Sequence, residues 1–312
     1  MNRENIIIDT DIGDDIDDAL ALAFALHSPE IHILGVTTVL GNTQARARIA
    51  VNLLQTAGFG QIPVYAGCGQ PMNQPVDETI IPCQYSEETM GTLEISSVHA
   101  VDYLIDCIMN APEAVTLVTI GPLTNVAVAL LKEPRLKQKL KRIVMMGGAY
   151  YFHYVEWNIY CDPEAANIVF QSGIPIDAVG LDVTKQCLMN GEQLERLKTE
   201  LNSPLIRLLW QLIEQWQINN KGRKYPILHD ALAVYGIFGR ELLQFEREAV
   251  SIELAGTATR GLTFNRTDRN REDQLIAGAE MQAERSVIQV AKAVDSQSFI
   301  DFFLNRLLSV KL

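Results

Sequence analysis

The chain has 312 residues, a mass of 34.7 kDa and a formal net charge of −12 at pH 7. This acidic balance argues against nucleic acid as a partner, because phosphate binding needs clustered Lys and Arg. The N-terminus shows no signal-peptide pattern, and Gly-Pro and Asn interrupt the longest apolar region, 114–131. We therefore expect no membrane span, no membrane partner and a cytoplasmic location. No linker divides the chain, so we expect a single domain over residues 1–312.

Residues 4–26 open the chain with an apolar run that leads into six aspartates within ten positions. The run Ile6 to Ile8 indicates a strand buried on both faces, and a helix is expected from Asp17 to residue 27. The acids then lie at the carboxyl end of a strand, where ligands bind in open α/β sheets. Oxygen ligands at this density favour a hard divalent cation, Ca²⁺ or Mg²⁺. A solvated acidic turn with an Asp capping the helix is the alternative.

Apolar runs and helical patterns alternate along the rest of the chain, which predicts an α/β fold with an open, mainly parallel sheet flanked by helices. The expected further strands are 31–38, 62–67, 114–121, 142–148 and 174–184. The expected further helices are 43–57, 97–110, 123–132, 163–172, 191–200, 203–220, 229–239 and 298–308. Residues 68–96 and 259–285 lack periodicity and are expected to be long loops.

The five cysteines are odd in number and show no C-x-x-C spacing. This pattern favours reduced, mostly buried thiols, and we do not expect a catalytic cysteine.

Besides the aspartates, three polar clusters follow an apolar run or open a helix. They are Gly41-Asn42, then Glu156-Trp157-Asn158 ahead of a Pro-started helix, and His229-Asp230. An amide and a carboxylate beside an aromatic ring suit sugar hydroxyls, which need paired donors and acceptors next to an apolar face. Each cluster also has a structural interpretation: a Gly-Asn turn, a polar loop, or an Asp helix cap beside a surface histidine.

Several common catalytic motifs are absent from the sequence: G-x-S-x-G, G-x-x-x-x-G-K-[ST], H-E-x-x-H and a complete G-x-G-x-x-G. Carboxylates, one histidine and amides that suit a polyol remain. This set fits hydrolysis of a glycosidic bond by a metal-bound water, with a carboxylate as base and an acid for the leaving group.

The segments DTDIGDDIDDALAL, TTVLGN, TIGPLTNVA, MGGA, EWN-x-x-CDPEAA and HDALAV occur in this order between residues 9 and 234. As a set they resemble the inosine-uridine nucleoside hydrolase family. The resemblance implies an open α/β fold with one Ca²⁺ at the carboxyl edge of its sheet. It also implies cleavage of the N-glycosidic bond of small-molecule ribonucleosides, in purine or pyrimidine salvage. We further expect a homo-oligomer, either a dimer or a tetramer.

The same resemblance assigns roles to individual positions of this sequence. Asp17 is then the general base, and His229 is a candidate acid for the leaving base. The ion has four protein ligands in this assignment: Asp11, Asp18, the backbone carbonyl of Ile120, and Asp230. The ribose-contacting positions are Asn42, Met146, Glu156 and Asn158.

The sequence departs from the family pattern at three places. The common form D-T-D-P-G-x-D-D-A is lengthened here by two residues, and the extra acids Asp14 and Asp15 compete for the roles given to Asp17 and Asp18. The segment between Met146 and Glu156 is short and lacks a counterpart of the asparagine that helps to hold the ribose. Residues 84–88, Gln-Tyr-Ser-Glu-Glu, replace the usual H-G-x-x-G element. These departures leave the preferred nucleobase open.

Two other classes of protein compete with a nucleoside hydrolase. The first is a metal-dependent phosphatase that forms an aspartyl-phosphate, since Asp9-Thr10-Asp11 follows a strand, although no suitable lysine is found. The second is a non-catalytic, calcium-dependent protein that binds a sugar or nucleoside. Retention of both Asp17 and His229 argues against the second class.

Overall fold

The computed structural model describes residues 3–220, 222–265 and 287–309. The described strands form a nine-stranded sheet in the order β3-β2-β1-β4-β5-β6-β9-β7-β8. The strands are β1 (Glu4–Thr10), β2 (Ile31–Thr38), β3 (Val64–Ala66), β4 (Val115–Thr119), β5 (Leu140–Met146), β6 (Ile176–Val179), β7 (Leu243–Ile252), β8 (Thr263–Asn265) and β9 (Val287–Val294). The pairs from β3 to β9 are parallel, and β7 and β8 add antiparallel pairs at one end. The predicted open, mainly parallel α/β sheet is confirmed.

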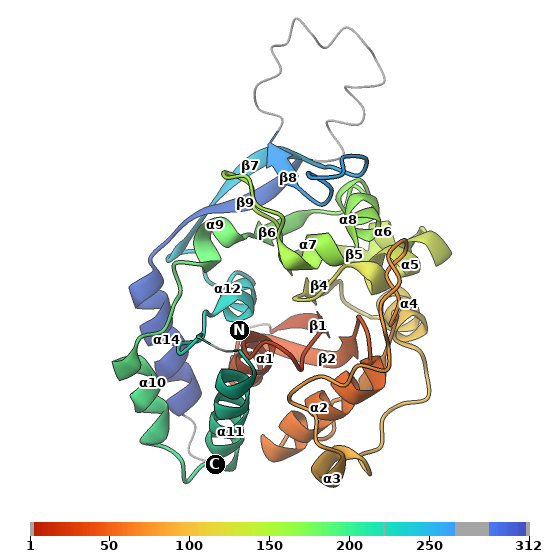
Figure 1. Ribbon diagram of the computed structural model, residues 1–312. Helices are drawn as coiled ribbons and strands as arrows, with labels where there is room; N and C mark the ends of the chain where they lie inside the picture. Colours follow the sequence, from red (N-terminus) through yellow and green to blue (C-terminus); the bar gives the residue numbers. More distant parts are fainter. Residues whose placement is uncertain (1–2, 221, 266–286, 310–312) are drawn as a thin grey trace, which may run out of the picture.

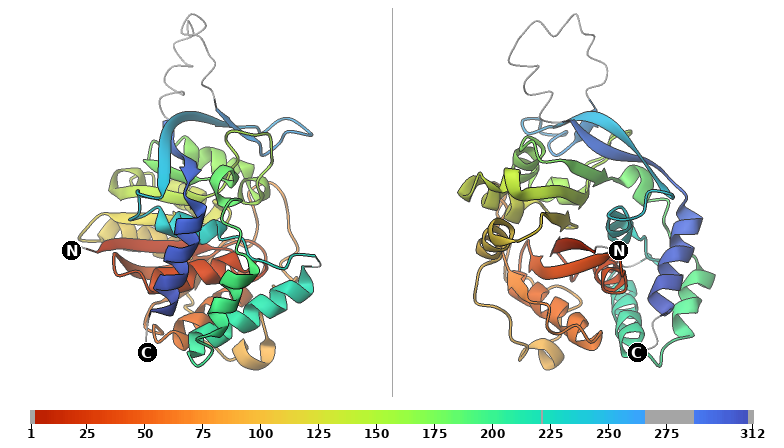
Figure 2. Two further views of the ribbon diagram at one scale, coloured as in Figure 1. Left: turned by 90° about the vertical axis from the view of Figure 1, so that its left-hand side faces the viewer. Right: turned by 180° about the vertical axis from the view of Figure 1, so that it is seen from behind.

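Helices cover both faces of this sheet (Figures 1 and 2). The longer ones are α1 (Asp17–Leu26), α2 (Thr43–Thr56), α4 (Ala100–Asn110), α5 (Thr124–Lys132), α8 (Pro163–Phe170), α10 (Gly191–Lys198), α11 (Pro204–Asn219), α12 (His229–Tyr235) and α14 (Ser296–Leu308). The shorter ones are α3 (Glu87–Met90), α6 (Leu136–Lys139), α7 (Trp157–Cys161) and α9 (Leu181–Thr184).

The alternation of side chains along the strands divides the hydrophobic core into two clusters. Ile6 and Ile8 face the cluster that includes α1, α2, α11, α12 and α14, whereas Ile7 faces the cluster that includes α4, α5 and α8. A strand buried on both faces needs a continuous apolar run, which is why the sequence of β1 shows no polar alternation.

The chain leaves β1 toward β2 and β3 on one side of the sheet and continues through β4 to β6 on the other side. The point between β1 and β4 is therefore the place where the strand order reverses, and open α/β sheets bind ligands in the crevice outside the carboxyl ends at such a point. Asp11 follows the last residue of β1, and Ile120 follows the last residue of β4. The sheet thus brings these two predicted metal ligands to the same crevice.

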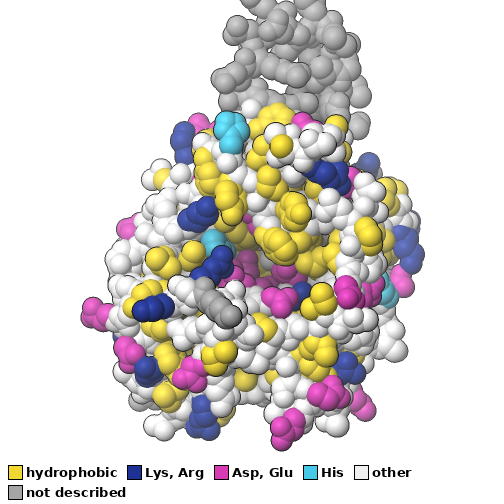
Figure 3. Space-filling model, viewed as in Figure 1, with side chains coloured by type: hydrophobic (Ala, Val, Ile, Leu, Met, Phe, Trp, Pro, Cys, Tyr) yellow, Lys and Arg dark blue, Asp and Glu magenta, His cyan; other side chains and the backbone are white. Residues whose placement is uncertain are grey.

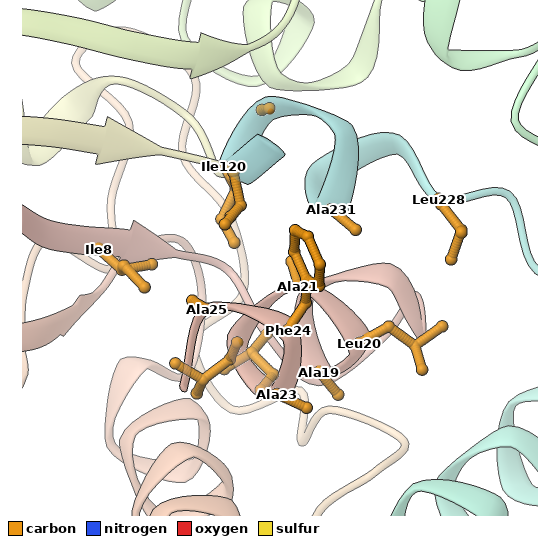
Figure 4. Close-up of a cluster of buried hydrophobic side chains, with 14 of the residues drawn as sticks. Ile8, Ala19, Leu20, Ala21, Ala23, Phe24, Ala25, Ile120, Leu228 and Ala231 are labelled. Atoms are coloured by element: carbon orange, nitrogen blue, oxygen red, sulfur yellow. The ribbon is translucent and has the colours of Figure 1, made fainter. Parts of the chain in front are cut away.

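Helix α1 is buried at each of its ten positions, so it lacks the polar face of an ordinary surface helix. Figure 4 shows its side chains gathered with Ile120 from the end of β4 and with Leu228 and Ala231 from the start of α12. Asp17 and Asp18 begin this buried helix. Their positions are consequently set by the hydrophobic core rather than by a surface loop.

Several sequence-based expectations were wrong in detail. The apolar run 174–184 is not one strand, because β6 ends at Val179 and α9 follows. The predicted loop 68–96 contains α3, and β8 lies within the predicted loop 259–285, of which residues 266–285 lie outside the described residues. Strands β7 and β9 and helices α6 and α7 were not predicted. All five cysteines are free, but only two of them, Cys161 and Cys187, are buried.

No helix among the described residues is long and apolar enough to cross a membrane.

Candidate active site

The first turns of α1 and α12 bring three aspartates together. Asp17 and Asp18 are the first residues of α1, and Asp230 is the second residue of α12. All three are buried, and carboxylate oxygens from the three lie within 4.8 Å of one another. The N-caps of the two helices, Ile16 and Leu228, have no side-chain cap hydrogen bond, so a capping role for these acids is wrong. Among the described residues, no other group of three His, Cys, Asp or Glu side chains is this close.

Three buried carboxylates cannot all carry a negative charge at this separation without a compensating cation or proton. Burial raises the pKa of each carboxyl well above its ordinary value, and the charges of the neighbouring aspartates raise it further. A divalent cation would offset this repulsion, and carboxylate oxygens are the ligands that hard cations prefer. The donor set therefore fits a metal ion of the calcium or magnesium type.

Asp11 lies beside this group but not within it. Its charge raises the pKa of Asp17, Asp18 and Asp230 alike, and burial raises the pKa of Asp11 itself to about 6. Gly121 permits a close approach here, since a Cβ on it would lie 2.8 Å from the backbone nitrogen of Asp11. The predicted ligand Asp11 thus lies near the group of three aspartates. The third member of that group, beside the predicted ligands Asp18 and Asp230, is Asp17, which was predicted as the base.

Glu156 and Asn158 organise the backbone around Ile120. Glu156 is the N-cap of α7, and its carboxylate accepts the backbone N–H groups of Gly148, Asn158 and Ile159 at 2.9–3.1 Å. Asn158 Nδ2 donates to the carbonyl oxygens of Ile120 and Met146, both at 3.1 Å. Four predicted residues therefore meet, namely Ile120, Met146, Glu156 and Asn158, and the Ile120 carbonyl keeps one lone pair for another partner.

Asn42 lies in a separate loop, between β2 and α2. Its side chain accepts the backbone N–H of Ala45 at 3.0 Å and so caps α2. The amide oxygen of Asn42 thus has a structural role as a helix cap, which the sequence analysis did not predict. The amide N–H₂ group of Asn42 makes none of the hydrogen bonds found among the described residues, which leaves donors for a ligand.

His229 precedes Asp230 and contacts α9. Its Nδ1 lies 2.7 Å from the Thr184 hydroxyl oxygen. Burial lowers the pKa of His229 to about 4, with smaller contributions from the charges of Arg223 and Lys185. The imidazole is consequently neutral at pH 7 in the free protein. Thr184 was missed from sequence because it ends the apolar run that was assigned to a single strand.

Two further residues, Thr10 and Asp9, lie beside the acids, and the sequence analysis considered them only for the phosphatase alternative. The Thr10 hydroxyl donates to Asp18 Oδ1 and accepts the backbone N–H of Ile12 at 3.1 Å. Asp9 is fully buried and accepts hydrogen bonds from Thr37 and from Asn125, the latter at 2.7 Å. Burial raises the pKa of Asp9 to about 7, and its Oδ2 has no hydrogen-bond partner in the described structure. The Thr10 hydroxyl within the D-T-D segment was the one feature of the sequence that could have indicated this contact with Asp18.

The extra acids Asp14 and Asp15 do not join the three-carboxylate group. Asp14 pairs with Arg46 at 2.8 Å, and Asp15 pairs with Arg223 at 3.3 Å. Gln84, which lies in the segment without the usual H-G-x-x-G element, donates through its side chain to the Asp15 carbonyl oxygen. The two-residue extension is therefore bound by cations and by this segment.

Figure 3 shows the middle of one face hollowed, with acidic side chains inside and hydrophobic side chains along the rim. Exposed aromatic residues come from the short segment before α7 and from α7 itself: Tyr151, Phe152, Tyr154, Trp157 and Tyr160. An acidic floor with a hydrophobic rim suits a ligand that combines a sugar with a flat base.

In the absence of a divalent cation, we expect the free energy of unfolding to fall as pH rises from about 4 to about 7. The ordinary pKa of an aspartate is 3.8, whereas Asp9 and Asp11 reach about 7 and about 6 in the folded protein. The folded state therefore binds more protons than the unfolded state within this window, and rising pH favours unfolding. His229 acts in the opposite direction between about 4 and 6.5, but it is a single group.

Urea titrations in chelator at several pH values measure this dependence. Addition of Ca²⁺ at pH 7.5 should then restore stability, because the ion binds only the folded arrangement of carboxylates. A stability that is constant or increases from pH 4 to 7 in chelator would contradict this expectation.

Comparisons with known proteins agree with this site. The family model described as inosine-uridine preferring nucleoside hydrolase matches residues 6–301. The Crithidia fasciculata protein named inosine-uridine preferring nucleoside hydrolase is 34% identical over 279 residues, covering 83% of this chain and 87% of that protein. Uridine nucleosidase 1 of Arabidopsis thaliana is 30% identical over 322 residues, covering 98% of this chain and 94% of that protein.

A solved structure, that of a plant nucleoside hydrolase, matches with a TM-score of 0.86 at 29% identity and covers 99% of this chain and 100% of its own. The sequence and structural matches thus extend over the strands, helices and loops that form the acidic crevice. The chain therefore belongs to the inosine-uridine preferring nucleoside hydrolase family and is a nucleoside hydrolase, an enzyme that acts on small-molecule nucleosides.

Proposed function

We propose that the enzyme hydrolyses the N-glycosidic bond of ribonucleosides to ribose and free base, with Ca²⁺ as its metal ion and Asp17 as its base. The observation that carries the proposal is the group of three buried carboxylates, Asp17, Asp18 and Asp230, with Asp11 beside them. Asp11, Asp18, Asp230 and the Ile120 carbonyl would hold the ion. When bound, Ca²⁺ would lower the pKa of a water in the crevice and neutralise the carboxylates around it.

The residues of the chain account for the remaining steps. Asp17 accepts a proton from the water, whose oxygen forms the new bond to C1′ of the ribose. The bond from C1′ to the base nitrogen breaks, and its electron pair leaves with the base. Glu156 and Asn158 support the ribose from the segment that they organise around Ile120 and Met146, and Asn42 contacts it from the loop between β2 and α2.

A direct assay tests the reaction. We expect reducing sugar to be released from inosine or uridine, release to stop in chelator, and activity to return with added Ca²⁺. Phosphate release from p-nitrophenyl phosphate should be absent, which separates this proposal from an aspartyl-phosphate phosphatase. Phosphate release without sugar release would refute it, and binding of nucleoside without either product would indicate the non-catalytic alternative.

Replacing His229 with alanine tests activation of the leaving group. His229 is neutral at pH 7, and a donor to Nδ1 from Thr184 would leave the hydrogen on Nε2, available to the departing base. We expect the variant to lose about 10² to 10⁴ in kcat on inosine or uridine. Activity on p-nitrophenyl riboside, whose leaving group needs no proton, should change much less.

The ratio of activity on the nucleoside to activity on p-nitrophenyl riboside separates activation of the leaving group by His229 from a general loss of stability. Equal losses on both substrates would mean that His229 only shapes the crevice or orients Asp230. The acid would then have to be sought elsewhere, with Tyr225 and Tyr85 as the next candidates.

We also propose that residues 1–312 form one domain, in keeping with the single sheet to which the described strands belong. Assembly into a dimer or tetramer is a further proposal, and light scattering of the purified protein measures it.

A further inference from the structure

Arg46 is a buried arginine on α2 that bonds to two loops of the active site. Its Nε donates to the carbonyl oxygen of Leu40 at 2.7 Å, and its Nη1 donates to the carbonyl oxygens of Asp11 and Ile12, the latter at 3.1 Å. One guanidinium group thus joins the loop after β1 to the loop after β2. The planar fork of an arginine suits several acceptors at fixed angles, which a lysine cannot match.

The loop after β2 needs such a restraint. Leu40 has a φ of 69° and is the only non-glycine residue with a positive φ among the described residues, and Gly41 follows with a φ of 64°. A leucine in this left-handed region is strained and persists only where surrounding contacts hold it. Arg46 bonds to the carbonyl of this residue, and Asn42 lies two positions further along the chain.

Asp14 completes the arrangement from the two-residue extension. Its Oδ2 accepts from Arg46 Nη2 at 2.8 Å, and its Oδ1 accepts the backbone N–H of Cys83 at 3.3 Å. The backbone N–H of Gln84 donates to the Gly13 carbonyl oxygen at 2.9 Å. The extension is thus bound on one side by segment 82–84, and it presents a carboxylate to the buried guanidinium on the other.

We propose that Arg46 and Asp14 form a pair of positioning residues that holds the loops carrying Asp11 and Asn42 as one unit. Asp14 balances the charge of Arg46 and orients its fork, and Arg46 fixes the backbone at Asp11 and at Leu40. The extra acid Asp14 therefore replaces neither the base nor a metal ligand. This inference rests on the proposed roles of Asp11 and Asn42.

Calorimetric titration with Ca²⁺, together with kcat and KM on uridine, tests the pair. We expect Asp14→Asn to weaken Ca²⁺ binding about tenfold and Arg46→Gln to weaken it by at least as much, in line with other residues that support metal ligands. Asp15→Asn is the matched control, because it removes the adjacent charge of the same extension without touching Arg46. Its Ca²⁺ affinity should stay within about threefold of the unsubstituted protein.

Two measurements show whether Arg46 and Asp14 act by positioning the loops. The Tm of Asp14→Asn tests for a loss of stability, and the Ca²⁺ affinity of Arg46→Lys tests for a simple effect of charge. The Asp14 side chain is 59% exposed, so Asp14→Asn should fold and lower Tm by only a few degrees. Arg46→Lys keeps the positive charge but loses the planar fork of the guanidinium group. Its Ca²⁺ affinity should therefore be as weak as that of Arg46→Gln. The double variant D14N/R46Q should be no weaker than R46Q alone, because residues that act as a pair are not additive.

The outcomes separate this inference from the proposed function. Suppose that the unsubstituted protein binds Ca²⁺ and hydrolyses uridine, but that Asp14→Asn and Asp15→Asn have the same Ca²⁺ affinity and the same kcat and KM. The positioning pair is then refuted, while the proposed function stands. Restoration of affinity by Arg46→Lys would likewise refute positioning and indicate a simple charge effect. If the unsubstituted protein neither binds Ca²⁺ nor cleaves a nucleoside, the proposed function fails and this inference fails with it.

Discussion

Asp18→Ala is expected to abolish Ca²⁺ binding and nucleoside hydrolysis together. Asp18 is buried, held by the Thr10 hydroxyl, and close to the carboxylates of Asp17 and Asp230. Its removal takes away a charge that would offset the dehydration of the ion. Calorimetry should show no Ca²⁺ binding at millimolar concentration, and release of reducing sugar should fall to background.

Asp18→Ala also removes a charge from a crowded group, so the ion-free variant should be at least as stable as the unsubstituted protein in chelator. A decrease in Tm would therefore point to misfolding rather than to loss of a ligand. Full activity in an ion-free Asp18→Ala protein would overturn the assignment of Asp18.

Asp17→Asn is expected to lower kcat by roughly two to four orders of magnitude while KM for uridine changes little. Asparagine keeps the shape of the side chain but cannot accept a proton from water. Since Asp17 belongs to the tightest carboxylate group, the variant should be assayed at saturating Ca²⁺ so that any weakening of the ion site is compensated.

The neighbouring acids supply the controls for Asp17. Asp14→Asn and Asp15→Asn leave the three-carboxylate group intact, and at saturating Ca²⁺ each should retain most of kcat. A loss of the expected size in either of them, with Asp17→Asn near normal, would show that the alignment across the two-residue extension is displaced. An Asp17→Asn protein that binds no Ca²⁺ at all would make Asp17 a ligand instead of the base.

The parallel part of the sheet and its acidic edge were predictable because burial on both faces leaves a direct mark on sequence. Ile6, Ile7 and Ile8 are each fully buried, and no polar residue interrupts them. Asp11, Ile120 and Met146 then come to one edge as a consequence of topology, since they lie at the ends of the parallel strands β1, β4 and β5. The sequence therefore placed the acids at a carboxyl end of the sheet, whereas the order of the strands was not predicted.

The antiparallel end of the sheet was not predictable in the same way. Strand β7 carries charged side chains at Glu246, Arg247 and Glu248, and its burial alternates irregularly along its length. Such a segment resembles a polar loop until a partner strand covers it. Around Gly180 the error was the reverse: the mostly apolar run 174–184 was predicted as one strand, although α9 begins within it at Leu181.

The residues that position the site were missed because their roles depend on tertiary contact. Arg46 lies in a helix beside Arg48, where an arginine is usually solvent-exposed, and its partner Asp14 is 32 positions away. The contact between Thr184 and His229 spans 45 positions. A single sequence carries no signal for such pairs, whereas the acids and the histidine were noticed because their residue types suggest chemistry.

The complete burial of α1 has a consequence for the dynamics of the enzyme. A helix with no solvent-facing side opens only when the surrounding core opens, so its hydrogen-bonded amides, from Leu20 onward, should exchange with solvent only through global unfolding. Asp17 and Asp18 are the first two residues of this helix, whereas the exposed aromatic residues near α7 lie at the surface. The carboxylates proposed to carry the chemistry therefore start an element that is held on every side by the core.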